Sequence, residues 1–155
     1  MGMKKVVLGL LAVWGGWQAY RWFDGSRAVS ACEGFAEAWA REDRTAAAKY
    51  GDSEAVRRAF EETPLRGTPG GAAMEAFRGT RYSVESRTRS AGGSVELVVR
   101  QTIFFDPPGV TTAIGGRMFA HFRHAATLRK TESGWRVAAF QPAYLDMGDL
   151  RQKAR

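Results

Sequence analysis

Residues 95–105, VELVVRQTIFF, decide the fold of this chain. Every second side chain in this stretch is apolar or, at one position, a neutral amide. This period of two predicts a strand with one buried face, made of Val95, Leu97, Val99, Gln101, Ile103 and Phe105. Residues 118–128 repeat the alternation and place Met118, Ala120, Phe122, His124, Ala126 and Leu128 on one face.

Two further strands are predicted on either side of this pair, at residues 82–88 and 135–144. Ala91-Gly92-Gly93 and Glu132-Ser133-Gly134 have the composition of tight turns. Strands that follow one another through short turns favour an antiparallel meander.

Helices are predicted before the strands. Val29, Cys32, Phe35, Ala36 and Trp39 recur at intervals of three and four residues, which lines one face of a helix. Glu42-Asp43 ends this helix and caps a short one that stops at Gly51. A third helix, with an apolar face between Ala55 and Phe60, ends at Pro64. Helices first and strands afterwards is the α+β pattern, with the helices on one face of the sheet.

Two segments resemble a known superfamily. Residues 37–50, EAWAREDRTAAAKY, resemble the helix–turn–helix opening of nuclear transport factor 2-like domains, a group that includes the SnoaL-like domains. Residues 133–138, SGWRVA, are similar to the last strand of such domains. The resemblance covers most of residues 28–145. It implies a cone, in which a strongly curved antiparallel sheet wraps around an N-terminal helix and leaves a pocket at the open end.

The N-terminal stretch predicts a membrane anchor. Lys4 and Lys5 precede an apolar run of 18 residues, 6–23, which would extend over about 27 Å as an α-helix and just span a bilayer core. Its far end carries an aromatic belt of Trp14, Trp17, Tyr20, Trp22 and Phe23. A cleaved signal peptide and a lipoprotein signal ending at Cys32 are the alternatives. If neither applies, Cys32 is a buried helix residue.

We therefore expect three parts: a membrane anchor at residues 1–27, the cone domain at 28–145, and a basic tail at 146–155. The Lys4-Lys5 pair favours a cytoplasmic N-terminus. The cone domain would then lie outside the cytoplasm, in the periplasm if the chain sits in a bacterial inner membrane.

Charge and composition exclude several functions. The formal charge is +7, but the basic residues are interspersed with acidic ones. The sequence therefore lacks the basic stripe that would indicate nucleic-acid binding. Two histidines, one cysteine and no acidic cluster give too few ligands for a metal site. No cofactor motif is present.

The candidate polar groups of the cone pocket are His124, Tyr82 and Gln101. Enzymes of the superfamily include isomerases and dehydratases, and such chemistry requires titratable groups in an apolar pocket. No residue signature of those enzymes matches here position by position. His124 is therefore either a general base or a structural histidine, bonded to a backbone carbonyl at the rim of the cone.

Residues 106–117, DPPGVTTAIGGR, form a long, mostly uncharged connection whose Val110, Ala113 and Ile114 predict a partner-binding loop. The alternative is an extended hairpin that packs on its own sheet. Membrane-anchored cones of the superfamily serve as non-enzymatic subunits. The resemblance and the anchor together predict a single-pass interaction or scaffolding subunit of a larger membrane protein complex, in contact with the lipid bilayer and with other membrane subunits. A small-molecule-binding or isomerase-type enzyme is the alternative.

Overall fold

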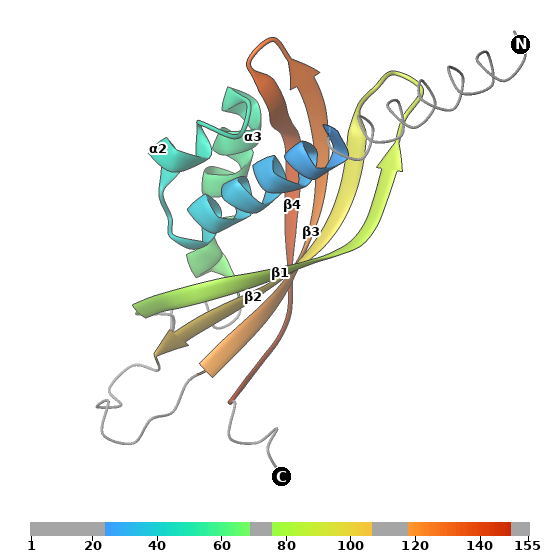
Figure 1. Ribbon diagram of the computed structural model, residues 1–155. Coiled ribbons are helices and arrows are strands. Elements are labelled where there is room, and N and C mark those ends of the chain that lie inside the picture. The colour runs from blue at the N-terminus through green and yellow to red at the C-terminus, as the bar shows by residue number, and fades with distance from the viewer. Residues whose placement is uncertain (1–23, 69–75, 107–117, 150–155) are drawn as a thin grey trace, which may run out of the picture.

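A four-stranded antiparallel sheet forms the body of the protein. The computed structural model describes residues 24–68, 76–106 and 118–149 (Figure 1). The strands are β1 (Ala76–Arg89), β2 (Val95–Asp106), β3 (Met118–Thr131) and β4 (Gly134–Asp149). Their order in the sheet, β1-β2-β3-β4, is the meander that the short turns predict.

The two faces of the sheet differ in burial. The predicted inward residues of β2 are all buried, from Val95 to Phe105, and so are Phe122, Ala126 and Leu128 of β3. We call the face with these residues the inner face and the opposite one the outer face. β1 departs from regular pairing between Phe77 and Gly79 and between Val84 and Ser86. Such bulges bend a strand and increase its twist, and β1 curves strongly in Figure 1.

The described helices all lie on the inner face (Figure 1). Residues 24–40 are helical and bury Cys32, Phe35 and Trp39 against the sheet. Short elements follow: α2 (Arg44–Ala47), α3 (Ser53–Arg57), the π-helical turn η1 (Arg58–Glu62) and the 3-10 turn η2 (Leu65–Gly67).

Glu42 and Asp43 end the first helix and cap α2, as the sequence predicts. Glu42 has a positive φ of 55°, a conformation that ends a helix. The Asp43 carboxylate accepts a hydrogen bond from the Ala46 amide at 2.9 Å and so caps α2.

A buried carboxylate fixes the long helix to one end of the sheet. Asp24 is 4% exposed and accepts hydrogen bonds from Arg89 Nη2 of β1 at 2.8 Å, Lys130 Nζ of β3 at 2.8 Å and Trp135 Nε1 of β4 at 3.0 Å. Burial acts to raise the pKa of Asp24, but the hydrogen bonds from Lys130, Trp135 and Arg89 outweigh it and hold this pKa below its ordinary value. Asp24 thus connects the helix to three strands.

The predicted fold class, a transmembrane helix followed by a cone with about three helices, is corrected by the structure. Among residues 24–68, 76–106 and 118–149, no helix is both long enough and apolar enough to cross a membrane. The helix at 24–40 includes Asp24, Glu33 and Glu37 and turns its apolar side to the core, and each of the later helical elements has three to five residues.

This finding contradicts two predictions, which are therefore wrong: that the chain is a transmembrane protein, and that its domain lies in the periplasm on a bacterial inner membrane. The predicted span, residues 6–23, and its aromatic residues Trp14, Trp17, Tyr20, Trp22 and Phe23 lie outside the described residues. The predicted boundaries after residues 27 and 145 fall inside regular elements, because the helix includes residues 24–40 and β4 reaches Asp149.

Candidate functional site

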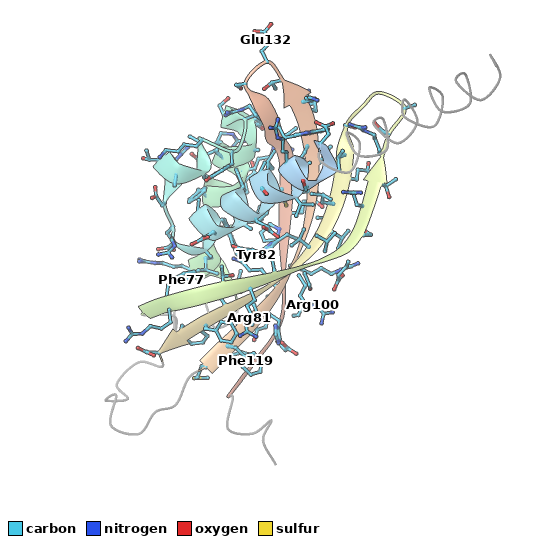
Figure 2. The ribbon with its side chains drawn as sticks, in the orientation of Figure 1. Phe77, Arg81, Tyr82, Arg100, Phe119 and Glu132 are labelled. Atoms are coloured by element: carbon cyan, nitrogen blue, oxygen red, sulfur yellow. The ribbon has the colours of Figure 1, made fainter. Side chains whose placement is uncertain are left out.

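The three candidate pocket residues form one hydrogen-bonded chain inside the protein. His124 Nε2 and Gln101 Oε1 are 2.7 Å apart. The Gln101 amide nitrogen donates to the Tyr82 hydroxyl at 3.1 Å and to the Ala36 carbonyl of the long helix at 3.4 Å. Sequence reasoning placed Gln101 and His124 on the inner face, and the structure confirms this. Tyr82, which Figure 2 shows on the helix side of β1, joins them.

Aromatic rings surround His124. The Trp39 ring meets the His124 ring edge-on, with centroids 5.4 Å apart. Phe122 and Phe140 lie stacked on it at 6.1 Å and 4.7 Å. Trp39 Nε1 donates to the carbonyls of Ala59 at 3.2 Å and Thr63 at 2.9 Å, which fixes the indole in the interior. Trp39 therefore occupies the space beside His124 that a substrate would need.

Burial decides the chemistry of this chain of polar groups. His124 and Gln101 are both 0% exposed. Desolvation lowers the pKa of His124 to about 3, so the imidazole is neutral near pH 7. Because Gln101 Oε1 can only accept, Nε2 carries the proton. His124 Nδ1 is then a bare acceptor, and it has no hydrogen-bond partner among the residues that the structure describes. Burial also raises the pKa of the Tyr82 hydroxyl. His124 and Gln101 are closed off from solvent, and Tyr82 is partly buried beside them. All three keep their protons near pH 7, so none is placed for acid–base catalysis.

The prediction that His124 is a structural histidine at the rim, bonded to a backbone carbonyl, needs correction in its detail. His124 lies in the core, and its partner is the Gln101 side chain.

Cys32 also lies in the core, at 0% exposure, as expected for a buried helix residue. The predicted partner-binding residues Val110, Ala113 and Ile114 lie outside the described residues.

A hollow of about 500 Å³ lies between α2, α3 and β4. Its lining includes Arg44, Thr45 and Arg136. The Arg136 guanidinium donates to the carbonyls of Ala48 at 2.9 Å, Lys49 at 3.4 Å and Gly51, and to the Asp52 carboxylate at 3.4 Å. Arg136 thus attaches the α2–α3 connection to β4, and its donors are committed to that structural role.

The outer face carries a charged cluster that spans three strands. The Glu85 carboxylate of β1 accepts from Arg100 Nε of β2 at 2.9 Å and from Arg123 Nε of β3 at 2.7 Å. The hydrogen bonds from Arg123 and Arg100 hold the pKa of Glu85 below its ordinary value. Since Arg123 must reach back to a residue of β1, the cluster lies over β2. Figure 2 shows Arg81 and Arg100 on the side of the sheet away from the helices.

One row of this face has the order of a nucleophile, a base and an acid. Thr102 Oγ1 lies 2.8 Å from His121 Nδ1, and His121 Nε2 lies 3.9 Å from the Asp146 carboxylate. A hydrolytic site also needs free donors for an oxyanion. Thr102 is in the middle of β2 and pairs with Arg81 and His121 on the neighbouring strands, so its backbone belongs to the ladder. The row is therefore a surface network.

Sequence reasoning missed Asp24 and the Glu85 cluster. Their partners are far apart in the sequence, 65 to 111 residues for Asp24. The available signal was the alternation of β2 and β3, which puts Arg100 and Arg123 on the polar face of each strand. Only the register shows that these two residues are directly opposite each other.

No family model matches this chain, and neither the curated proteins nor the solved structures include a significant match to it. The resemblance to nuclear transport factor 2-like domains therefore stays a prediction. Among the described residues, no group of three or more histidine, cysteine or acidic side chains is placed to hold a metal ion.

Proposed function

We propose that this chain is a non-enzymatic interaction domain that binds another protein through the outer face of its sheet. One observation carries the proposal: the polar groups that could act on a substrate, His124 and Gln101, are fully enclosed. A candidate base that solvent cannot reach, with a ring packed on each side, supports a structural role.

The outer face, unlike this enclosed interior, is exposed to solvent. Ala125, Ala139 and Ala143 are exposed there, beside the Glu85–Arg100–Arg123 cluster. No described helix covers this face (Figure 1). An antiparallel sheet with one face on the core and the other open can bind a partner over its open face.

Site-specific photo-cross-linking in producing cells tests this function. A photoreactive amino acid at Ala125 should form a discrete adduct with a protein. The same amino acid at Ala48, exposed on the helical side, serves as the matched control and should form none. Equal labelling from both positions, or no adduct from Ala125, would contradict the proposal.

A further inference from the structure

We propose that the outer face recognises an acidic segment of its partner protein through three guanidinium groups, those of Arg81, Arg100 and Arg123. This inference rests on the proposed function and names the chemistry of the partner. It follows from the way the sheet gathers these three side chains, orients them and leaves donors available on each.

The three arginines come from three neighbouring strands. Arg100 of β2 pairs directly with Arg123 of β3, and Arg81 of β1 pairs with Thr102, two residues farther along β2. Side chains directly opposite each other on one face have Cβ atoms about 5 Å apart, and diagonal neighbours are about 7–8 Å apart. The three side chains therefore form one group on the outer face, which we call the arginine patch; Figure 2 shows Arg81 and Arg100 on the side away from the helices.

The pairing of Arg100 with Arg123 is unfavourable for the sheet itself. Like charges directly opposite each other destabilise an antiparallel pair, and an acidic residue at either position would remove that cost. Natural sequences break local rules of this kind mainly at functional sites. The pair therefore indicates a function that needs two cations side by side.

Glu85 orients this pair without covering it. It is the extra residue of the bulge between Val84 and Ser86, and bulges re-aim a side chain in this way. Its carboxylate accepts a hydrogen bond from Nε of each arginine, which leaves their terminal Nη nitrogens to bind an incoming anion. The Glu85 side chain is 25% exposed, against 50% for Arg100 and 54% for Arg123. An approaching partner thus meets the guanidinium groups before the carboxylate.

Arg81 is held by an aromatic ring instead of a carboxylate. Its guanidinium lies 5.6 Å from the centre of the Phe104 ring, a cation–π contact that orients the group and uses none of its donors. Within the described ranges of the chain, no carboxylate forms an ion pair with Arg81. A planar guanidinium with its donors free is the group that binds a carboxylate through two parallel hydrogen bonds.

The charges around the patch favour a carboxylate ligand that belongs to a protein. The patch holds three positive charges and the one negative charge of Glu85, an excess of two. Glu96 and Asp146 lie on the same face, opposite Thr127 and His121 of β3. A nucleic acid or an anionic membrane would bring negative charge over these acids too, whereas such ligands need a surface of one sign. A protein segment can place its carboxylates on the patch alone.

The spacing of the patch predicts the pattern of the ligand. In an extended chain, side chains two residues apart lie on one side, about 6.6 Å from each other. This distance is close to the diagonal between Arg81 and Arg100. A segment with two acidic residues separated by one other residue can therefore place one carboxylate at Arg81 and the next between Arg100 and Arg123.

Fluorescence anisotropy on the purified full chain tests the site with two labelled ten-residue peptides, in which either glutamate or glutamine alternates with threonine. The glutamate peptide should bind, with a Kd that rises with salt, and the glutamine peptide should not. Arg123→Gln should raise the Kd about tenfold. The matched control Arg66→Gln removes the same charge from an exposed position on the helical side and should leave the Kd unchanged. Equal binding of the two peptides, or no binding of the glutamate peptide at about 1 mM, would overturn the proposal.

A conservative change separates a built site from general attraction between charges. Arg123→Lys keeps the positive charge but loses the planar guanidinium, so it should raise the Kd of the glutamate peptide about threefold or more. Arg66→Lys should not change it. Equal affinity of Arg123→Lys and the wild type would overturn the site, and so would tighter binding of a single-stranded DNA of ten nucleotides than of the glutamate peptide.

The cross-linking at Ala125, two residues from Arg123 on the same face, separates this inference from the proposed function. A variant with Arg81, Arg100 and Arg123 all changed to Gln should lose most of the adduct, and Arg66→Gln should keep it. An adduct of full intensity in the triple variant would overturn the acidic ligand and leave the interaction domain standing. No adduct even in the wild type would overturn both.

Discussion

Acidification should destabilise this protein well above the pH at which its carboxylates titrate, because His124 is buried in its neutral form. Its pKa is about 3 in the folded protein, against about 6.5 for an unperturbed histidine. Because the folded value is the lower one, the unfolded chain takes up the proton first as the pH falls. The stabilisation from neutral burial is complete above about pH 6.5 and is lost progressively between about pH 6.5 and 3.

The magnitude follows from these two pKa values. Proton uptake by the unfolded state lowers the free energy of unfolding by about 2 kcal/mol between pH 7.5 and pH 5. The Asp24 pKa is held below its ordinary value, so that carboxylate adds its own loss of stability only at lower pH.

Urea unfolding of the purified protein at pH 7.5 and pH 5 measures the effect, followed by intrinsic tryptophan fluorescence. His124→Phe should be less stable than the wild type at pH 7.5, because Gln101 loses its partner, and it should lose about 2 kcal/mol less on acidification. Phe122→Leu is the control: it weakens the same core by removing part of a ring but keeps the histidine, so it should retain the pH dependence. If His124→Phe shows the same pH dependence as the wild type, the reasoning is refuted.

Three further predictions concern groups that hold the fold together. Asp24→Ala should lower the free energy of unfolding by about 2 kcal/mol, since Arg89, Lys130 and Trp135 lose a shared acceptor. The control is Glu132→Ala in the exposed β3–β4 turn, which should leave urea unfolding unchanged. Equal stability of the two variants would contradict the role of Asp24. Trp39→Phe should lower the free energy of unfolding by about 2 kcal/mol in the same assay, because it removes the donor to Ala59 and Thr63 and leaves a cavity beside His124. A urea midpoint equal to that of the wild type would contradict this packing. Burial, assisted by the charge of Glu33, raises the pKa of the Cys32 thiol to about 12. A thiol reagent should therefore modify Cys32 only in denaturant. Rapid labelling of the native protein would show that the helix at residues 24–40 is not packed on the sheet.

The strands could be predicted because their signal is local. The alternation in residues 95–105 and 118–128 identifies both the strand and its buried face, and glycine-containing turns identify the order of strands. The inner-face position of Gln101 and His124 follows from this alternation alone. Their mutual hydrogen bond does not, because it depends on the register between β2 and β3 and on the twist that brings the two side chains together.

The helical part was predicted less well for a physical reason. The apolar content of residues 6–23 predicts a membrane anchor, and the boundary predicted after residue 27 assigns Asp24 to that anchor. In the structure Asp24 belongs to the fold, as the acceptor for donors from three strands. Long-range partners of this kind leave no periodic signal in the sequence, and the same holds for Glu85 with Arg100 and Arg123.

The central claim is that this protein works through the outer face of its sheet and that its interior is structural. The most direct test compares the native mass of two variants in extracts of producing cells, His124→Phe in the interior and Ala125→Glu on the outer face. We predict that His124→Phe keeps the mass of the wild-type assembly and that Ala125→Glu has the mass of a single chain. An intact assembly in Ala125→Glu, together with its loss in His124→Phe, would contradict the account.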